Sequence, residues 1–224
     1  MGDAIVTREL SRYFGNRPAL IDVSLRIPKE CIFCIAGPNG SGKTTLLNIL
    51  AGVLSPSKGE FEVGSGLRIG YAYQHPKLCD ELTIGENLSF FSQLGGGERE
   101  WCENLIEMMK LKGFLEENAG ELSSGTRKRV EVAVSLLHNP DIIFMDEPTA
   151  GLDIESTKEV LELIKFFKKR GKTAVIATHQ LEEFGGVCEM LAVLSRGRIA
   201  LERDVRRMSG KRLMQIYASA LGKG

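Results

Sequence analysis

The chain has 224 residues, enough for one large domain or for a core with an inserted lobe. Lysine plus arginine and aspartate plus glutamate number 29 each, so no overall positive charge favours a nucleic-acid partner. No apolar run reaches the length of a membrane-spanning helix, and the first residues lack the pattern of a secretory signal peptide. We therefore expect a cytoplasmic protein that does not bind nucleic acid.

The first third of the chain predicts β-structure. Short runs rich in apolar and β-branched residues are separated by glycine, proline and serine. These runs span residues 4–10, 20–27, 31–36, 61–63 and 68–73.

The five cysteines, an odd number, do not indicate a disulfide framework. Cys31 and Cys34 have the spacing of a redox or metal motif, but both lie in the apolar run 31–36. Cysteine packs in such a run as a small hydrophobic residue. We expect core packing for both side chains.

The segment 37–44 follows that apolar run and reads Gly-Pro-Asn-Gly-Ser-Gly-Lys-Thr. Glycines let successive N–H groups turn inward, and the helix that follows attracts anions with its positive end. Lys43 adds a full charge near the outer phosphates, and Thr44 offers a hydroxyl to Mg²⁺. The pattern predicts a site for a nucleoside triphosphate, formed by Gly37, Pro38, Asn39, Gly40, Ser41, Gly42, Lys43, Thr44 and Thr45.

Helical periodicity extends over residues 83–137, and three consecutive glycines at 95–97 divide it. After Pro140 the pattern changes to strand 141–145, helix 155–169 and strand 173–178. Such alternation predicts a parallel sheet that binds ligands at the carboxyl ends of its strands. We expect a single α/β domain over residues 1–224. Its core comprises 1–75 and 140–224, and a helical subdomain is inserted at 76–139.

Small polar residues precede a helical pattern at Ser123, Ser124 and Gly125. Either serine suits a helix N-cap, which is a purely structural role. A helix N-terminus with exposed N–H groups is also an anion site. Because the chain already has a complete phosphate loop, a second anion site suggests that one nucleotide is shared between two subunits.

Two carboxylates stand at the end of the apolar strand around 141–145. Asp146 suits Mg²⁺, because hard cations prefer oxygen ligands. Glu147 suits the orientation or partial deprotonation of a water aimed at the γ-phosphate. An Asp-Glu pair is a weak signal alone, but it becomes strong together with an upstream phosphate loop.

Two further polar residues end predicted strands at the same edge. His179 follows the strand 173–178, and Gln74 follows the strand 68–73. The Gln74 amide could join the Mg²⁺ shell or hold the attacking water. The candidate catalytic residues are thus Glu147, His179 and Gln74, and the candidate Mg²⁺ ligands are Thr44, Gln74 and Asp146.

The C-terminal part carries an excess of positive charge over Glu202 and Asp204. Two interpretations remain open, a solvated helix face or a surface that approaches anionic lipid or a membrane partner. The basic residues are Arg196, Arg198, Arg203, Arg206, Arg207, Lys211, Arg212 and Lys223.

Together these motifs resemble the ATP-binding subunit of ABC transporters over essentially the whole chain. The resemblance implies a P-loop NTPase core of mainly parallel sheet, an antiparallel β subdomain and an inserted helical subdomain. The matching motifs are Walker A at 37–44, the Q-loop at Gln74, the signature at 122–126, Walker B with the catalytic glutamate at 142–147, the D-loop at 151–153 with Asp153, and the switch His179.

The resemblance also implies activity and partners. We expect hydrolysis of ATP with Mg²⁺ that powers transport through a separate integral-membrane permease, with this subunit on the cytoplasmic face of the cell membrane. A second ATPase subunit is expected to pair head to tail with the first when ATP is bound. An aromatic residue should stack on adenine. Tyr13 and Phe14 both qualify, and Phe14 is favoured because it precedes Gly15, although a core role for either stays open.

The signature departs from the family's common Leu-Ser-Gly-Gly-Gln, since Ser124 replaces the first glycine and Thr126 the glutamine. Ser123 and Gly125 are retained, so contacts to the opposed γ-phosphate are expected to survive. The residues that follow the signature, with the segment 85–91, are similar to those of subunits serving ABC-2-type exporters.

Two other classes of protein are alternatives to a transporter subunit. A soluble ABC-type ATPase acting on a cytosolic assembly, such as an iron–sulfur scaffold, stays open as the alternative. A GTPase or small-molecule kinase is disfavoured, because the chain lacks an Asn-Lys-x-Asp guanine-reading pattern and contains the signature and His179.

Overall fold

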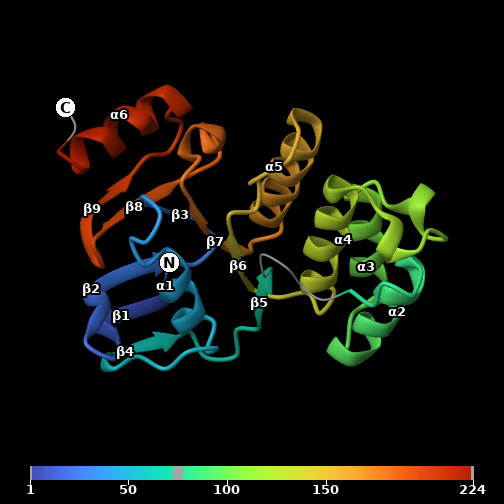
Figure 1. Cartoon of the computed structure of the whole chain (residues 1–224), viewed down its shortest axis with the longest axis horizontal. Coiled ribbons are helices and arrows are strands. Elements are labelled where there is room, and N and C mark those ends of the chain that lie inside the picture. The colour runs from blue at the N-terminus through green and yellow to red at the C-terminus, as the bar shows by residue number, and fades with distance from the viewer. Residues whose placement is uncertain (1, 73–77, 223–224) are drawn as a thin grey trace.

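The computed structural model describes residues 2–72 and 78–222. Within these residues a six-stranded sheet forms the centre of the molecule, with strand order β5-β6-β7-β3-β8-β9 (Figure 1). The strands from β5 to β8 run parallel, and β9 pairs antiparallel with β8. The bounds are β3 (Ile32–Ala36), β5 (Ile69–Ala72), β6 (Ile142–Asp146), β7 (Thr173–Thr178), β8 (Met190–Ser195) and β9 (Arg198–Asp204).

A separate antiparallel sheet packs beside the central one, with order β2-β1-β4. Its strands are β1 (Asp3–Phe14), β2 (Arg17–Pro28) and β4 (Lys58–Val63). The expected α/β architecture with a mainly parallel sheet and an antiparallel β part is confirmed.

The central strands β3, β6 and β7 are buried along their whole length. This is characteristic of a parallel sheet covered on both faces. Side chains alternate between the faces, so Cys34 joins the core shared with α5, whereas Phe33 joins the core shared with α1. The expected core packing of the cysteine pair is confirmed, and burial raises the pKa of the Cys31 thiol to about 12.

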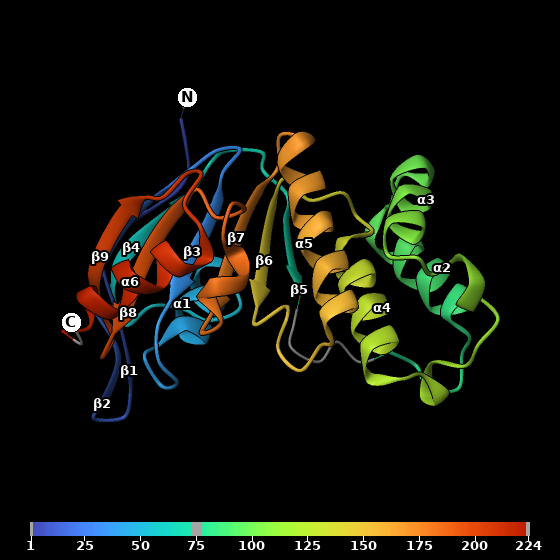
Figure 2. The same cartoon turned by 90° about the horizontal axis from the view of Figure 1, so that it is seen from above.

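Three helices between β5 and β6 lie together at the β5 end of the central sheet, whereas the antiparallel sheet and α6 lie at the other end (Figures 1 and 2). The three are α2 (Ile84–Gly95), α3 (Arg99–Met108) and α4 (Ser124–Leu136). The remaining α-helices are α1 (Lys43–Leu50), α5 (Ile154–Lys169) and α6 (Gly210–Ala220), and short 3₁₀ helices span Lys112–Phe114, Ala119–Glu121 and Leu181–Phe184.

Local sequence signals explain where α2 begins and ends. Thr83 caps its N-terminus in a capping box with Glu86, which satisfies two backbone N–H groups. Gly96 ends it with a φ of 66°, in the left-handed region that favours glycine. The predicted break at residues 95–97 is therefore confirmed.

The strands β8 and β9 and the helix α6 occupy a region that the sequence analysis interpreted only by its charge. Leu213 and Ile216 form the buried face of α6, which packs against the 3₁₀ helix Leu181–Phe184. Over residues 2–72 and 78–222, no helix combines the length and apolar character needed to cross a membrane.

Candidate functional site

The glycine loop connects the carboxyl end of β3 to the first turn of α1. Gly42, the last residue before α1, has a φ of 108°, and a Cβ there would lie 2.6 Å from the Ala19 carbonyl oxygen. A Cβ on Gly37 would clash with the Leu194 carbonyl oxygen. Both positions require glycine, so the backbone can turn its N–H groups toward a ligand.

Lys43 opens α1, and its side chain is only 6% exposed. Its Nζ donates to the Gly37 carbonyl oxygen at 2.9 Å and lies 3.5 Å from Glu147 Oε1. A buried ammonium is costly unless it is paired. The loop carbonyl and the carboxylate from the end of β6 supply that pairing.

Thr44 and Asp146 lie together at the carboxyl edge of the sheet. The Thr44 hydroxyl donates to Asp146 Oδ2 at 2.6 Å. Burial raises the pKa of Asp146, and the Thr44 hydrogen bond opposes that shift. Asp146 Oδ1 is buried and has no hydrogen-bond partner among the described residues. The Thr44 hydroxyl and the Asp146 carboxylate thus lie together, and one carboxylate oxygen is unused. This arrangement fits a hard cation such as Mg²⁺.

The described residues contain no group of three or more His, Cys, Asp or Glu side chains that could hold a metal.

Glu147 and His179 are held together across two neighbouring strands. Glu147 follows β6 and has a φ of 49°, which is uncommon for a residue other than glycine. His179 follows β7, and its backbone N–H donates to Glu147 Oε2 at 3.2 Å, while its Nδ1 lies 2.9 Å from the same oxygen. The His179 side chain is 46% exposed, so much of the imidazole stays accessible although one ring nitrogen contacts Glu147.

A pocket of ≈ 280 Å³ is lined by the glycine loop, Asp146 and Glu147, but not by His179. Phe14 and Tyr13 do not line it. They end β1, at the tip of the β1–β2 hairpin, and Phe14 is 51% exposed. Gln74, the third candidate catalytic residue, lies outside the described residues. The lining residues are Ala19, Asn39, Gly40, Ser41, Gly42, Lys43, Thr44, Thr45, Asp146 and Glu147.

The second candidate anion site lies at the N-terminus of α4. Ser123 is the N-cap, and its hydroxyl accepts from the Thr126 N–H at 3.2 Å, as one of the two sequence interpretations predicted. A pocket of ≈ 430 Å³ opens between α4 and α5 and includes Ser124, Gly125 and Asp153 in its lining. Asp153 is the N-cap of α5. Its carboxylate accepts a hydrogen bond from the Ser156 N–H, which lowers the pKa of Asp153.

A polar network that the sequence analysis missed supports this cap. Thr126 Oγ1 accepts from Arg129 Nη2 at 3.1 Å and from the Ser123 hydroxyl at 3.0 Å. Arg129 in turn pairs with Glu159 of α5 at 3.1 Å, where both side chains are about one-tenth exposed. The i, i+3 spacing of Thr126 and Arg129 was a signal in the sequence, but the pairing with Glu159 needed the fold.

The two candidate anion sites of one chain line different pockets. The glycine loop leads into α1, whereas α4 lies beyond β6 and α5 in both views (Figures 1 and 2). The pocket at the glycine loop is lined by none of residues 123–125.

Comparison with known proteins decides the family. A family model described as ABC transporter matches residues 20–150, which include the glycine loop, the α4 cap and the β6 carboxylates. The chain belongs to the ABC transporter family. The ABC transporter ATP-binding protein NatA of Bacillus subtilis is 32% identical over 98% of this chain and 99% of its own length.

Other relatives agree. An uncharacterized ABC transporter ATP-binding protein of Methanocaldococcus jannaschii is 34% identical over 202 residues, covering 88% of this chain and 76% of the relative. The ADP conformation of MJ1267, an ATP-binding cassette of an ABC transporter, matches with a TM-score of 0.84 and 26% identity over 100% of both chains. The cassette MJ0796, in a dimeric post-hydrolysis state with ADP and phosphate, matches with a TM-score of 0.80 and 26% identity, covering 90% of this chain and 99% of that one.

This ABC protein is therefore an ATP-binding subunit and an ATPase that powers transport with a membrane permease. The function expected from the motifs, an ATPase subunit that powers transport, is confirmed, and the alternative of a soluble ATPase acting on a cytosolic scaffold is disfavoured.

Proposed function

We propose that this ABC subunit binds ATP in its glycine loop, with Mg²⁺ held by Thr44 and Asp146 and with Gln74 as a further ligand. The observation that carries the proposal is the ion pair between Lys43 and Glu147 at 3.5 Å. This pair supports the proposal, because a carboxylate lies next to the buried ammonium, where the outer phosphates of ATP would pair with Lys43. Bound Mg²⁺ would neutralise charge on the β- and γ-phosphate oxygens.

Glu147 is the proposed base that orients the attacking water. When phosphate takes over the pairing with Lys43, Glu147 Oε1 becomes available to a water molecule. Oε2 stays anchored by the His179 backbone N–H at 3.2 Å and by Nδ1 at 2.9 Å. Phosphoryl transfer depends mainly on positioning and electrostatic stabilisation, so a fixed carboxylate and an adjacent imidazole suit the orientation of the attacking water. Gln74 is proposed to hold the same water.

Phe14 is the proposed platform for adenine. The Arg12 guanidinium lies 4.8 Å from the centre of its ring, and the ring remains 51% exposed. A cation on one face leaves the other face for a stacked base. Tyr13 is the weaker candidate, because its exposed fraction is smaller.

Two copies are proposed to pair head to tail around ATP. Within one chain the glycine loop and the α4 cap lie on opposite sides of β6 and α5 (Figure 2). A second copy, turned by a two-fold axis, can bring its Ser123, Ser124 and Gly125 to the γ-phosphate, with Asp153 beside them. The dimeric cassette structures among the matches support this arrangement.

The proposed partner is a separate integral-membrane permease, which places this subunit on the cytoplasmic face of the cell membrane. We further propose an exporter of the ABC-2 type. Supporting this, NatA matches over almost its whole length, and relatives about 30% identical are named for Nod factor export and lantibiotic transport.

Cross-linking tests the dimer. One copy carries Asn39→Cys, and a second, differently tagged copy carries Ser124→Cys. Both copies also carry Glu147→Gln, and Cys79→Ser removes an exposed native cysteine. We expect ATP to promote a disulfide between the two copies. Ser65→Cys, on an exposed turn, replaces Asn39→Cys as the control and should not cross-link. Equal cross-linking by the control, or no dependence on ATP, would contradict the arrangement.

Cell fractionation tests the partner. A tagged chain should be recovered with membranes, together with an integral-membrane protein. Recovery in the soluble fraction with a cytosolic scaffold would instead favour the alternative function.

A further inference from the structure

A third cavity lies at the opposite end of β3 from the glycine loop. Its volume is ≈ 430 Å³, within the range of about 300–1,000 Å³ typical of small-molecule sites. Ile32, the first residue of β3, lies in its wall, whereas the glycine loop follows the last residue, Ala36. Five strand residues at about 3.3 Å each separate the two sites by roughly 16 Å along the strand. This cavity is therefore not part of the nucleotide pocket.

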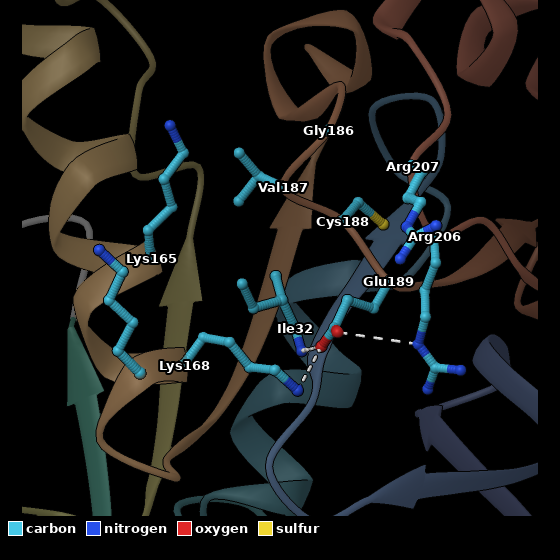
Figure 3. A pocket seen from close by; sticks show the side chains of 10 residues that line it. Ile32, Lys165, Lys168, Gly186, Val187, Cys188, Glu189, Arg206 and Arg207 are labelled. Carbon is cyan, nitrogen blue, oxygen red and sulfur yellow. Dashed lines mark hydrogen bonds and ion pairs between the residues drawn. The ribbon is translucent and has the colours of Figure 1, made fainter.

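Two basic segments, distant in sequence, meet at this cavity. Lys165, Lys168 and Lys169 come from the last turns of α5, and Arg206 and Arg207 follow β9. Figure 3 shows Lys165 and Lys168 on one side and the two arginines on the other. Lysines in a last helical turn are expected from the helix dipole alone, but the dipole of α5 does not account for the two arginines.

Glu189 is the only carboxylate among the described lining residues, and it lies between these cations (Figure 3). Its Oε2 accepts from the Ile32 N–H at 3.0 Å and lies 2.9 Å from Lys168 Nζ. Its Oε1 lies 3.7 Å from Arg206 Nε. The carboxylate is anchored to the sheet and holds one cation on each side, so the cavity wall is preorganised.

Pairing accounts for only some of the positive charge. Lys165 pairs with Glu162 at 2.7 Å, and Arg206 pairs with Asp204 at 2.8 Å. Lys168 pairs with Glu189, so three carboxylates form ion pairs with three of the five lining cations. Within the described part of the chain, Lys169 and Arg207 form no ion pair, which leaves an excess of two positive charges.

We propose that this cavity binds a phosphate monoester, which carries a charge of about −1.5 to −2 at neutral pH. Lys169 and Arg207 supply the pairing charges, and the guanidinium offers a fork of donors to phosphate oxygens. The buried side chains of Ile32 and Val187 supply an apolar wall for the rest of the ligand. The ligand is a soluble phosphorylated molecule or a lipid with the same headgroup chemistry.

The test uses the full chain with one equivalent of ADP, so that nucleotide fills the glycine loop without excess. Glycerol 3-phosphate is the soluble probe, followed by ³¹P NMR line broadening. Vesicles of phosphatidic acid in phosphatidylcholine present the same monoester on a lipid, with pure phosphatidylcholine vesicles as the blank. We expect saturable binding that weakens with added salt.

Lys169→Gln with Arg207→Gln should weaken binding at least tenfold. Lys58→Gln with Lys211→Gln removes the same charge from two exposed residues outside the cavity, and it should leave binding unchanged. Glu189→Gln keeps an acceptor for the Ile32 N–H but removes the negative charge between Lys168 and Arg206, so it should tighten binding several-fold. Basal ATPase activity should stay the same in the double variants, which confirms that they fold.

Binding of glycerol 3-phosphate assigns the site to soluble ligands, and binding of phosphatidic acid vesicles alone assigns it to lipid. Both support a phosphate monoester, provided that the cavity double variant loses the binding. The proposal is overturned if neither probe binds or if the cavity and control double variants behave alike. An unchanged affinity in Glu189→Gln would overturn it as well.

Discussion

The glycine-loop edge and the α4 cap are both candidate anion sites, but they are built differently. The loop edge draws Lys43, Glu147 and His179 from three segments, and the Lys43 and Glu147 side chains are only 6% and 11% exposed. The α4 cap is formed by neighbouring residues of one helix start, with Ser123 bonded to Thr126. The first site is thus assembled from distant segments of one chain, whereas the second is a local surface that we propose acts on a nucleotide only through a second copy.

Because of this difference, ATP binding by one chain can be tested separately from the pairing of two chains around ATP. Changes at the loop edge should affect a single chain, because its charges are already paired there. Changes at the α4 cap should leave a single chain able to bind ATP and should affect only activity that depends on the pair.

The largest effect is expected from Glu147→Gln. Loss of a positioned base lowers turnover by about 10²–10⁴-fold, whereas ATP still binds because Lys43 and the loop remain. Steady-state ATPase assays and gel filtration with ATP measure the two effects, and the variant should accumulate as a dimer. Glu107→Gln, on the exposed face of α3, is the matched control. Unchanged turnover in the Glu147 variant would reject the assigned role.

Lys43→Ala should weaken ATP binding by at least about 30-fold, since losing one partner of a buried charge pair costs about 2–5 kcal/mol. Equilibrium binding of a fluorescent ATP analogue measures it on the monomer. Lys58→Ala, at the exposed start of β4, should bind like the parent chain. Equal affinities for the two variants would refute a role for Lys43 in the cradle.

Ser123→Arg should leave ATP binding by the monomer unchanged and lower turnover about tenfold, because an oversized side chain in a packed contact costs about 1–3 kcal/mol. If activity depends on pairing, the ATPase rate of the parent chain should rise more than proportionally with protein concentration. The Ser123 variant should lose this upward curvature. Ser65→Arg is the control on a remote turn. If the Ser123 variant fails to bind ATP as a monomer, the separation of the two sites is wrong.

The smallest effect is expected from Thr126→Val, which keeps the shape but removes the oxygen that joins Arg129 to Ser123. One hydrogen bond contributes about 0.5–1.5 kcal/mol, so turnover should fall about threefold. Thr157→Val on α5 is the control. A full-rate Thr126 variant would show that the network only stabilises the helix start.

Contiguous motifs made much of the site predictable. Gly37 to Thr45 form a strand-to-helix turn whose geometry depends on nearest neighbours, and Ser123 caps a helix through a residue three positions away. The six-stranded order was not predictable beyond its parallel character. The strands β8 and β9 were missed because the region was judged by charge, although 190–195 is an apolar run.

The sequence alone thus determined the short-range chemistry: the glycine loop, its lysine, the paired carboxylates at the end of β6 and the serine cap. Tertiary structure alone decided that Lys43 meets Glu147, that His179 anchors the same carboxylate, that Arg129 pairs with Glu159, and that α5 lysines face the arginines after β9. Backbone turns and caps follow from local bonding, whereas contacts between distant segments depend on how both faces of a buried sheet are packed.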